Sequence, residues 1–281
     1  MEFEVENGGV VLRGCVQGPK DAAATHSDAA SVLLVHGACV DGSFWDGATA
    51  VLARDFRVAG YDRRGYGRSP LPADAEAGAD PDCSVEAQAG DAAAVIRTLG
   101  APAHVVAHSG GCAIAMELAA AHPELVARLV LDEPLFYDCA PAEGAFAATS
   151  ERIRAALARG NHSLALHLFM PTLGATDPES RAPQPSVEAS RANCDHFIRH
   201  EYLALSRFCP DYEALARADV RIVCSELPHG EQYPACAAEL ARRIDAPLVP
   251  APGAHNFPAD RPHEFAALMA GLLPDVPAPE P

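Results

Sequence analysis

The sequence predicts an α/β protein with a doubly wound, mostly parallel sheet and an all-helical insertion, or lid, after its sixth strand. Short apolar segments, typical of strands buried on both faces, alternate with segments of helical periodicity over residues 31–134. The alternation stops over 135–216, where only helical patterns occur, and resumes after 217. This order of strands and helices implies right-handed crossovers and parallel pairing.

The composition indicates a globular chain with an acidic surface. Of 281 residues, 49% are hydrophobic and 21% are charged, which is enough apolar material for a sizeable core. The formal net charge of -17 argues against nucleic acid or an anionic membrane as a partner. No apolar run reaches the roughly 18 residues that span a bilayer, and the acidic start lacks the pattern of a signal peptide. We therefore expect a cytoplasmic monomer or homodimer.

The nine cysteines form no Cys-x-x-Cys pair, so they predict neither a zinc site nor a disulfide framework. A reducing cytosol fits this pattern, and we expect no metal. Cys112 and Cys224 lie among apolar residues and are predicted to be small core side chains.

The first half of the chain carries clear turn and cap signals. Alternating residues around Asn7-Gly8-Gly9 predict a β-hairpin. Ser84 is a predicted N-cap, and Gly100 ends the helix that follows it. The expected elements are, in order, a hairpin over 3–16, a linker over 20–31, a strand over 32–35, a helix over 43–55, a strand over 57–62, a loop to 83, a helix over 85–100, a strand over 103–109, a helix over 110–122 and a strand over 126–134.

The second half contains the predicted lid and the end of the sheet. A lid here covers the carboxyl edge of the sheet, where open α/β sheets bind ligands. The expected elements are helices over 150–160, 161–170 and 186–208, then a strand over 220–227, a helix over 233–244, a strand within 246–255 and a helix over 261–273. The predicted division is a core of 1–134 and 217–275, a lid of 135–216 and a frayed tail of 276–281.

Ser109 lies where a predicted strand meets a predicted helix, in the segment Ala107-His108-Ser109-Gly110-Gly111. A serine in so sharp a turn takes a strained conformation, and the residues two before and two after it approach closely. Ala107 and Gly111 meet the need for small side chains, as in a nucleophile elbow. The alternative is an ordinary serine in a glycine-rich loop.

Four segments, LLVHGA, YDRRGYGRS, VVAHSGG and PGAHNFPADRPHEF, together resemble the α/β-hydrolase superfamily over most of the chain apart from the lid. The resemblance implies an α/β-hydrolase fold. In relatives the loop at Asp62–Ser69 is structural, which leaves Arg63, Arg64 and Arg68 as surface or lid-contact charges. The loop that begins at His36-Gly37 resembles an oxyanion loop.

Attack by Ser109 would create an oxyanion that needs two backbone N–H donors. One would be Gly110, the residue after the nucleophile, and the other would be Ala38 in the first loop, with Cys39 as the neighbouring choice. The alternative is a glycine loop without a catalytic role.

The general base is predicted to be His255, which follows a strand, precedes a helix and matches the last triad member of the superfamily. His263 is expected on a helix surface and His36 as a packed loop residue. His108 cannot turn easily toward the adjacent Ser109, so we expect it to line the pocket or pack under the loop.

The acid of the triad is the open question, because a carboxylate must hold the tautomer of the histidine. The loop after residue 225 offers Glu226 and Glu231, whereas Asp132 and Glu133 end the preceding strand and should point to opposite sides. The Glu-Pro ending resembles a subgroup that includes lactonases acting on zearalenone, whose triad acid is a glutamate at this position. We favour Glu133, with Glu226 as the first alternative and Asp132 after it.

These residues predict a serine hydrolase that cleaves an ester or lactone of a small apolar molecule through an acyl-enzyme, without a cofactor. His108, Phe136 and Trp45 are predicted to line the substrate pocket. The apolar lid residues either line it or form the core of the lid; they are Phe169, Met170, Leu173, Phe197, Tyr202 and Phe208. C–C bond hydrolysis and perhydrolysis use the same triad, and a ligand-binding protein without turnover is the alternative from another class.

Overall fold

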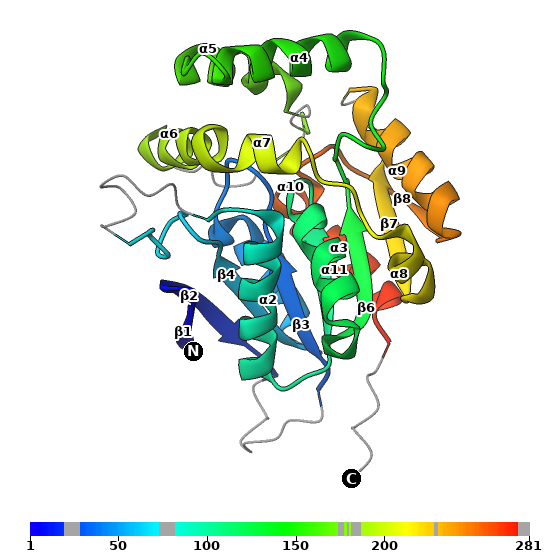
Figure 1. Cartoon of the computed structure of the whole chain (residues 1–281). Helices are drawn as coiled ribbons and strands as arrows, with labels where there is room; N and C mark the ends of the chain where they lie inside the picture. Colours follow the sequence, from blue (N-terminus) through cyan, green and yellow to red (C-terminus); the bar gives the residue numbers. More distant parts are fainter. Residues whose placement is uncertain are drawn as a thin grey trace.

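The structure is a computed structural model of the chain, and it describes residues 1–19, 29–72, 82–173, 177–178, 180, 187–227 and 230–274. An eight-stranded sheet has helices on both faces and a group of lid helices at one end (Figure 1). The predicted doubly wound fold, with a helical insertion after the sixth strand, is confirmed. Most of the predicted linker over 20–31 and the predicted tail over 276–281 lie outside the described residues.

The sheet is parallel except at the edge that holds the N-terminus. Its strands lie in the order β1-β2-β4-β3-β5-β6-β7-β8. β1 and β2 form the predicted hairpin, β2 runs antiparallel to β4, and the remaining neighbours are parallel. The strands are β1 Glu2–Asn7, β2 Val10–Gln17, β3 Ser31–Val35, β4 Arg57–Asp62, β5 Ala103–His108, β6 Val126–Asp132, β7 Val220–Ser225 and β8 Leu248–Ala251.

Helices connect the parallel strands and build the lid. Those of the core are α1 Asp46–Leu52, α2 Val85–Leu99, α3 Gly111–Ala121, α8 Tyr212–Arg217, α9 Gln232–Ile244, α10 Phe257–Asp260 and α11 Pro262–Leu272. Most of α8 falls within the predicted lid range of 135–216, but α8 packs against α3 and α9 of the core. Those of the lid are α4 Ala145–Leu157, α5 His162–Phe169, α6 Val187–His196 and α7 Tyr202–Leu205, with a π-helical turn Phe197–Glu201 between the last two. The sequence does not predict α8 or α10, because six and four residues are too few to show a periodic pattern.

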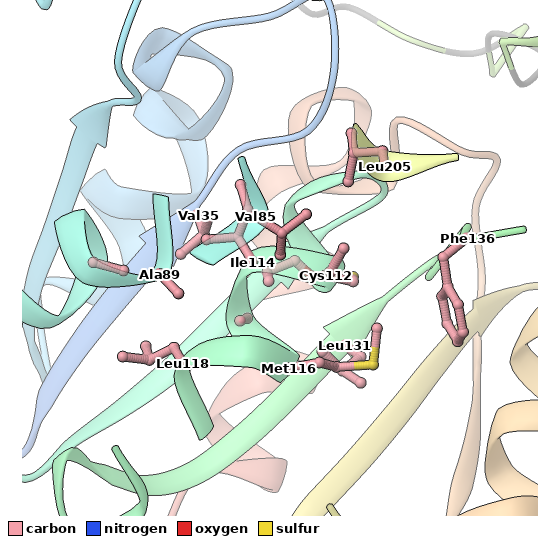
Figure 2. Packing of buried hydrophobic residues seen from close by; sticks show 14 of the residues in the cluster. Val35, Val85, Ala89, Cys112, Ile114, Met116, Leu118, Leu131, Phe136 and Leu205 are labelled. Atoms are coloured by element: carbon pink, nitrogen blue, oxygen red, sulfur yellow. Dashed lines mark hydrogen bonds between the residues drawn. The ribbon is translucent and has the colours of Figure 1, made fainter. Parts of the chain in front are cut away.

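Two apolar clusters cover opposite faces of the sheet. Adjacent strand residues point to opposite sides, so Leu33 and Val105 join one cluster while Leu34 and Val106 join the other. The first cluster includes α2, α3 and α9, and the second includes α1, α10 and α11. Figure 2 shows part of the first, with Leu131 of β6 beside side chains of α3. Burial of both faces explains why these strands are continuous apolar runs.

The lid has an aromatic core that is continuous with the first cluster. The ring of Phe169 lies 4.9 Å from that of Phe197 and 5.8 Å from that of Tyr202. These three rings and Phe208 are buried, so they form the interior of the lid, whereas Met170 is 45% exposed. Phe169, Phe197 and Tyr202 therefore form the lid core, whereas Phe208 and Leu173 each border a cavity beside the lid helices.

Two other expectations are tested by the fold. Cys112 is buried as predicted, whereas Cys224, on β7 next to the edge strand β8, is only partly buried. Along the described ranges of the chain, every helix is too short or too polar to pass through a bilayer.

Candidate active site

The candidate site lies where the strand order reverses. β3 lies between β4 and β5 in the sheet, so successive connections run to opposite sides of β3. Open α/β sheets form a crevice at such a point, beyond the carboxyl ends of the strands. The loop after β3 carries Gly37 and Ala38, and the loop after β5 carries Ser109.

Ser109 occupies a sharp turn between β5 and α3. Its φ is +53°, a left-handed conformation that is unfavourable for a residue with a Cβ. Its N–H donates to Asp132 O at 2.9 Å, and its C=O accepts from Cys112 N–H at 3.0 Å. The strand, turn and helix that an elbow requires are therefore all present.

The turn leaves no room for larger neighbours. A Cβ on Gly111 would lie 2.5 Å from His36 O, and a Cβ on Gly37 would lie 3.0 Å from Ser109 Cβ. The expectation that the residue two after Ser109 must be small is confirmed. Gly37 shows that the same limit applies to the loop after β3.

His255, in the loop after β8, lies between Ser109 and Glu133. Its Nε2 is 3.2 Å from Ser109 Oγ, and its Nδ1 is 3.3 Å from Glu133 Oε2. Such contacts are often this long in unliganded sites and shorten when substrate binds. The ring packs between Tyr233 and His108, with centroid distances of 4.1 and 4.6 Å. Ser109, His255 and Glu133 are all buried, and Ser109 is the most exposed of the three at 8%.

Backbone geometry after the end of β6 directs the Glu133 carboxylate. Glu133 has a φ of +53°, and its N–H donates to Val223 O at 2.9 Å. Its Oε1 accepts from Ser225 N–H at 2.6 Å, while Oε2 faces His255. The Ser225 hydroxyl donates to Ala254 O at 2.9 Å, which holds the loop that carries His255.

Positive φ values gather at this site. In the part of the chain that the structure describes, four non-glycine residues have a positive φ, and three of them are Cys39, Ser109 and Glu133. Strained backbone of this kind concentrates at functional sites, where the surrounding structure must maintain it.

The other carboxylates that the sequence offers lie elsewhere. Glu226 and Glu231 are exposed, and the carboxylate that contacts His255 Nδ1 in this structure is that of Glu133. Asp132 Oδ2 lies 2.8 Å from His108 Nδ1. The adjacent Asp132 and Glu133 side chains therefore diverge, as strand alternation predicts, and each meets a different histidine.

Burial controls the protonation of these histidines. It lowers the pKa of His255 to about 4, although the hydrogen bond with Glu133 opposes the shift. It also lowers the pKa of His108 to about 4. His255 is therefore neutral at pH 7, which is the form that can accept a proton from a serine hydroxyl.

The N–H groups of Ala38 and Gly110 belong to neighbouring loops. Ala38 N lies 3.7 Å from the position that a Cβ on Gly110 would take. Gly110 is the N-cap of α3, and the first amides of a helix attract anions because they have no partner within the helix. Leu205 Cδ1 of the lid lies 3.6 Å from the same position, so the lid packs directly over the elbow.

Two side chains predicted to line the pocket are in the core instead. Trp45 and Phe136 are both 0% exposed, so no water-sized cavity touches them. The ring of Trp45 packs against that of Phe265 on α11, 5.7 Å away. Nearness in sequence to a catalytic loop does not set the direction of a side chain, and this is why the expectation fails. His108 packs under the loop, stacked on Phe44 at 4.8 Å.

Two arginines expected as surface or lid-contact charges are buried. Arg64 forms an ion pair of 2.6 Å with Asp91 of α2, so for Arg64 the expectation is wrong. Arg63 pairs with Glu201 of the lid at 3.0 Å, which confirms a lid contact and excludes a surface position. The sequence does not single out Glu201, because its partner is 138 residues away. A buried arginine signals only that some buried carboxylate must pair with it.

Two of the described cavities lie beside the lid helices, and a third lies between β2, β4 and α1. One of about 1060 Å³ lies between α4, α5 and the start of α9 and reaches Gln232, next to the Tyr233 ring that packs on His255. Within the same described ranges, no group of three or more His, Cys, Asp or Glu side chains is arranged to hold a metal ion.

Comparison with known proteins decides the family. The model of the alpha/beta hydrolase family matches residues 32–268. The chain belongs to this family. This α/β-hydrolase is 29% identical over 249 residues to the uncharacterized hydrolase YraK of Bacillus subtilis (strain 168), with 86% of the chain and 88% of that protein covered.

Solved structures share the fold of this α/β-hydrolase. A thermophilic esterase from Thermogutta terrifontis superposes with a TM-score of 0.71 at 19% identity, over 97% of both chains. The enol-lactonase from Burkholderia xenovorans LB400 superposes with a TM-score of 0.70 at 20% identity, over 96% of this chain and 98% of the other. At such identities the likeness shows the fold alone.

Proposed function

We propose that this α/β-hydrolase cleaves a carboxylic ester or lactone of a small apolar molecule through an acyl-enzyme. Ser109 is the nucleophile, His255 the general base and Glu133 the acid of the triad. The observation that carries the proposal is the continuous contact from Ser109 Oγ through His255 to Glu133, at 3.2 and 3.3 Å. A serine rather than an aspartate at the elbow favours acyl transfer over haloalkane or epoxide chemistry.

In the first half-reaction, His255 Nε2 takes the hydroxyl proton of Ser109 while Oγ attacks the carbonyl carbon. The carbonyl oxygen becomes an oxyanion that accepts hydrogen bonds from the N–H groups of Ala38 and Gly110. The oxyanion then collapses to a carbonyl, the bond between the acyl carbon and the alkoxy oxygen breaks, and the imidazolium of His255, stabilised by Glu133, gives its proton to that leaving oxygen. With a lactone, that alkoxide stays attached to the acyl group.

In the second half-reaction, water replaces the alcohol. His255 takes a proton from the water, and the resulting hydroxide attacks the acyl carbon of the ester on Ser109. The second oxyanion collapses, the acid is released, and the proton on His255 returns to Ser109 Oγ. No group outside the protein and the two substrates takes part.

The lactone part of the proposal rests on the position of Glu133 after β6, which resembles that of the acid in zearalenone-type lactonases. Simple p-nitrophenyl esters and a panel of macrolactones are therefore the substrates to compare. We expect turnover of p-nitrophenyl butyrate, stopped by one equivalent of a serine-directed phosphonate that labels the peptide containing Ser109. Labelling without turnover would favour the ligand-binding alternative, and a label on another serine would contradict the proposal.

The low pKa of His255 predicts the pH dependence of the reaction. Because the base must be neutral and its pKa is about 4, we expect kcat/KM to be constant above about pH 5 and to fall about tenfold per pH unit below pH 4. Initial rates with p-nitrophenyl butyrate, followed at the isosbestic wavelength of p-nitrophenol, measure this. If kcat/KM instead begins to fall near about pH 6.5, the ordinary pKa of a histidine, burial does not set the pKa of His255.

A further inference from the structure

Two side chains hold the carbonyl group of the Gly37–Ala38 peptide. Arg63 Nη2 donates to Gly37 O at 2.9 Å, and His36 Nδ1 lies 2.9 Å from the same oxygen. The N–H of Arg63 donates to His36 Nε2 at 3.0 Å, so the neutral imidazole carries its proton on Nδ1 and donates it to Gly37 O. The carbonyl therefore accepts two hydrogen bonds, one of them from a cation.

In a trans peptide the C=O and the following N–H point in opposite directions. Holding Gly37 O therefore aims the N–H of Ala38 away from Arg63, on the side where Gly110 lies. A cation on the carbonyl also polarises the peptide, which makes its N–H a stronger donor.

The lid holds Arg63 in this position. Glu201 ends the π-helical turn between α6 and α7, and both of its oxygens lie 3.0 Å from Arg63 Nη1. The Tyr66 hydroxyl donates to Glu201 at 3.0 Å, and Gln88 accepts a hydrogen bond from Arg63. Glu201 is 0% exposed and Arg63 is 1% exposed.

The charges of this pair are fixed. Burial alone would raise the pKa of Glu201, but Arg63 and His196 outweigh it and lower the pKa to about 2. Separating Arg63 from Glu201 would leave two buried charges without a partner. The free energy of doing so is unfavourable, and the ion pair therefore stays formed while the lid is in place. The carboxylate of Glu201 is placed here by the π-helical turn. Such turns have poorer hydrogen-bond geometry than an α-helix and are frequent at functional sites.

We propose that Arg63 and Glu201 are positioning residues that couple the lid to the oxyanion donor Ala38. This inference rests on the proposed function, because it assigns the Ala38 N–H its part in that reaction. Glu201 holds Arg63, Arg63 holds Gly37 O, and the Ala38 N–H is thereby aimed and polarised. A lid that moves Glu201 away loosens the donor that the transition state needs.

The first test does not depend on activity. In full-length protein labelled with [1-13C]glycine and [15N]alanine, an HNCO spectrum shows only Gly–Ala pairs, so one cross-peak reports Gly37 C=O and Ala38 N–H together. We expect this peak to move more than those of the other Gly–Ala pairs in Glu201→Gln. Arg63→Lys serves as a second variant, since lysine keeps the charge but replaces the two nitrogens that contact Glu201 and Gly37 O separately, Nη1 and Nη2, by a single ammonium on a shorter side chain.

Asp91→Asn is the matched control, because Asp91 of α2 forms a buried ion pair with Arg64, the residue after Arg63, and its hydrogen bonds go to Arg64 and Asn7 rather than to Gly37. We expect this variant to lose stability and to leave the Gly37–Ala38 peak in place. An unmoved peak in both Glu201→Gln and Arg63→Lys, or an equal movement in Asp91→Asn, would overturn the inference.

The second test uses kinetics. An oxyanion donor acts mainly in the transition state, so we expect kcat in Glu201→Gln to fall about ten- to hundredfold with KM nearly unchanged. The Ki of a trifluoromethyl ketone, which forms an oxyanion on Ser109, should rise by a similar factor. An equal fall of kcat in Asp91→Asn would show that the fall in Glu201→Gln comes from a loss of stability and not from the oxyanion donor. A wild-type protein without ester turnover would contradict the proposed function, while the spectrum would still decide this inference.

Discussion

We expect Ser109→Ala to lower kcat for p-nitrophenyl butyrate by about 10⁴- to 10⁶-fold, a larger fall than for Glu133→Gln or Glu201→Gln. Without Oγ there is no acyl-enzyme, and the remaining rate comes from water activated near His255. Stopped assays with a phosphonate-treated blank measure the residual rate, and intact-mass spectrometry shows whether the variant still takes up the phosphonate.

The matched control is Ser150→Ala. Ser150 is also buried, but it lies in the lid: its hydroxyl donates to Phe146 O within α4 at 2.9 Å and interacts with the hydroxyls of Tyr137 and Tyr202. This variant should keep the wild-type kcat and the phosphonate label. Full turnover in Ser109→Ala would disprove the mechanism, and an equal loss in Ser150→Ala would trace the effect to folding.

The second large effect is expected from Glu133→Gln, with a fall in kcat of about 10³- to 10⁴-fold. Glutamine keeps the shape of the side chain and an oxygen for the Ser225 N–H, so the loop should stay in place. It removes the charge that stabilises the imidazolium of His255 and can hold the wrong tautomer. Rates at several pH values, with KM measured separately, separate this loss from a loss of binding.

Glu226→Gln is the matched control for the acid, since it makes the same chemical change at an exposed glutamate. Its kcat should stay within about twofold of the wild-type value. If Glu226→Gln loses orders of magnitude and Glu133→Gln does not, the acid has been assigned to the wrong strand. Losses in both would point to a site that rearranges when substrate binds.

Much of the fold follows from local patterns. The apolar runs at Val32–Val35 and Ala103–His108 are strands because both faces of a parallel sheet are buried, and Ser84 and Gly100 bound α2 because of their capping chemistry. The elbow is also local. A serine between a strand and a helix, followed two residues later by a glycine, can be recognised without a structure.

The side chains that surround Ser109, His255 and Glu133 are harder to predict from the local sequence. Trp45 and Phe136 stand beside the right loops in the sequence, yet their side chains turn into the core. Tyr233, whose ring packs on His255, carries no sequence signal, because it is one of several buried side chains of α9 and nothing in the local pattern connects it with a histidine 22 residues later. The direction of a side chain depends on the exact backbone path, which a pattern of residue types does not contain.

The sequence by itself determined the order of the strands and of the longer helices and the position of Ser109 in a sharp turn, and the resemblance of its motifs to a superfamily pointed to His255 among twelve histidines. These depend on neighbours within a few residues. Only the tertiary structure decided that Glu133 rather than Glu226 faces His255, across 122 residues, and that Glu201 reaches Arg63 across 138. Such contacts depend on how the lid and the sheet pack together, and charge and burial, rather than spacing along the chain, select the partners.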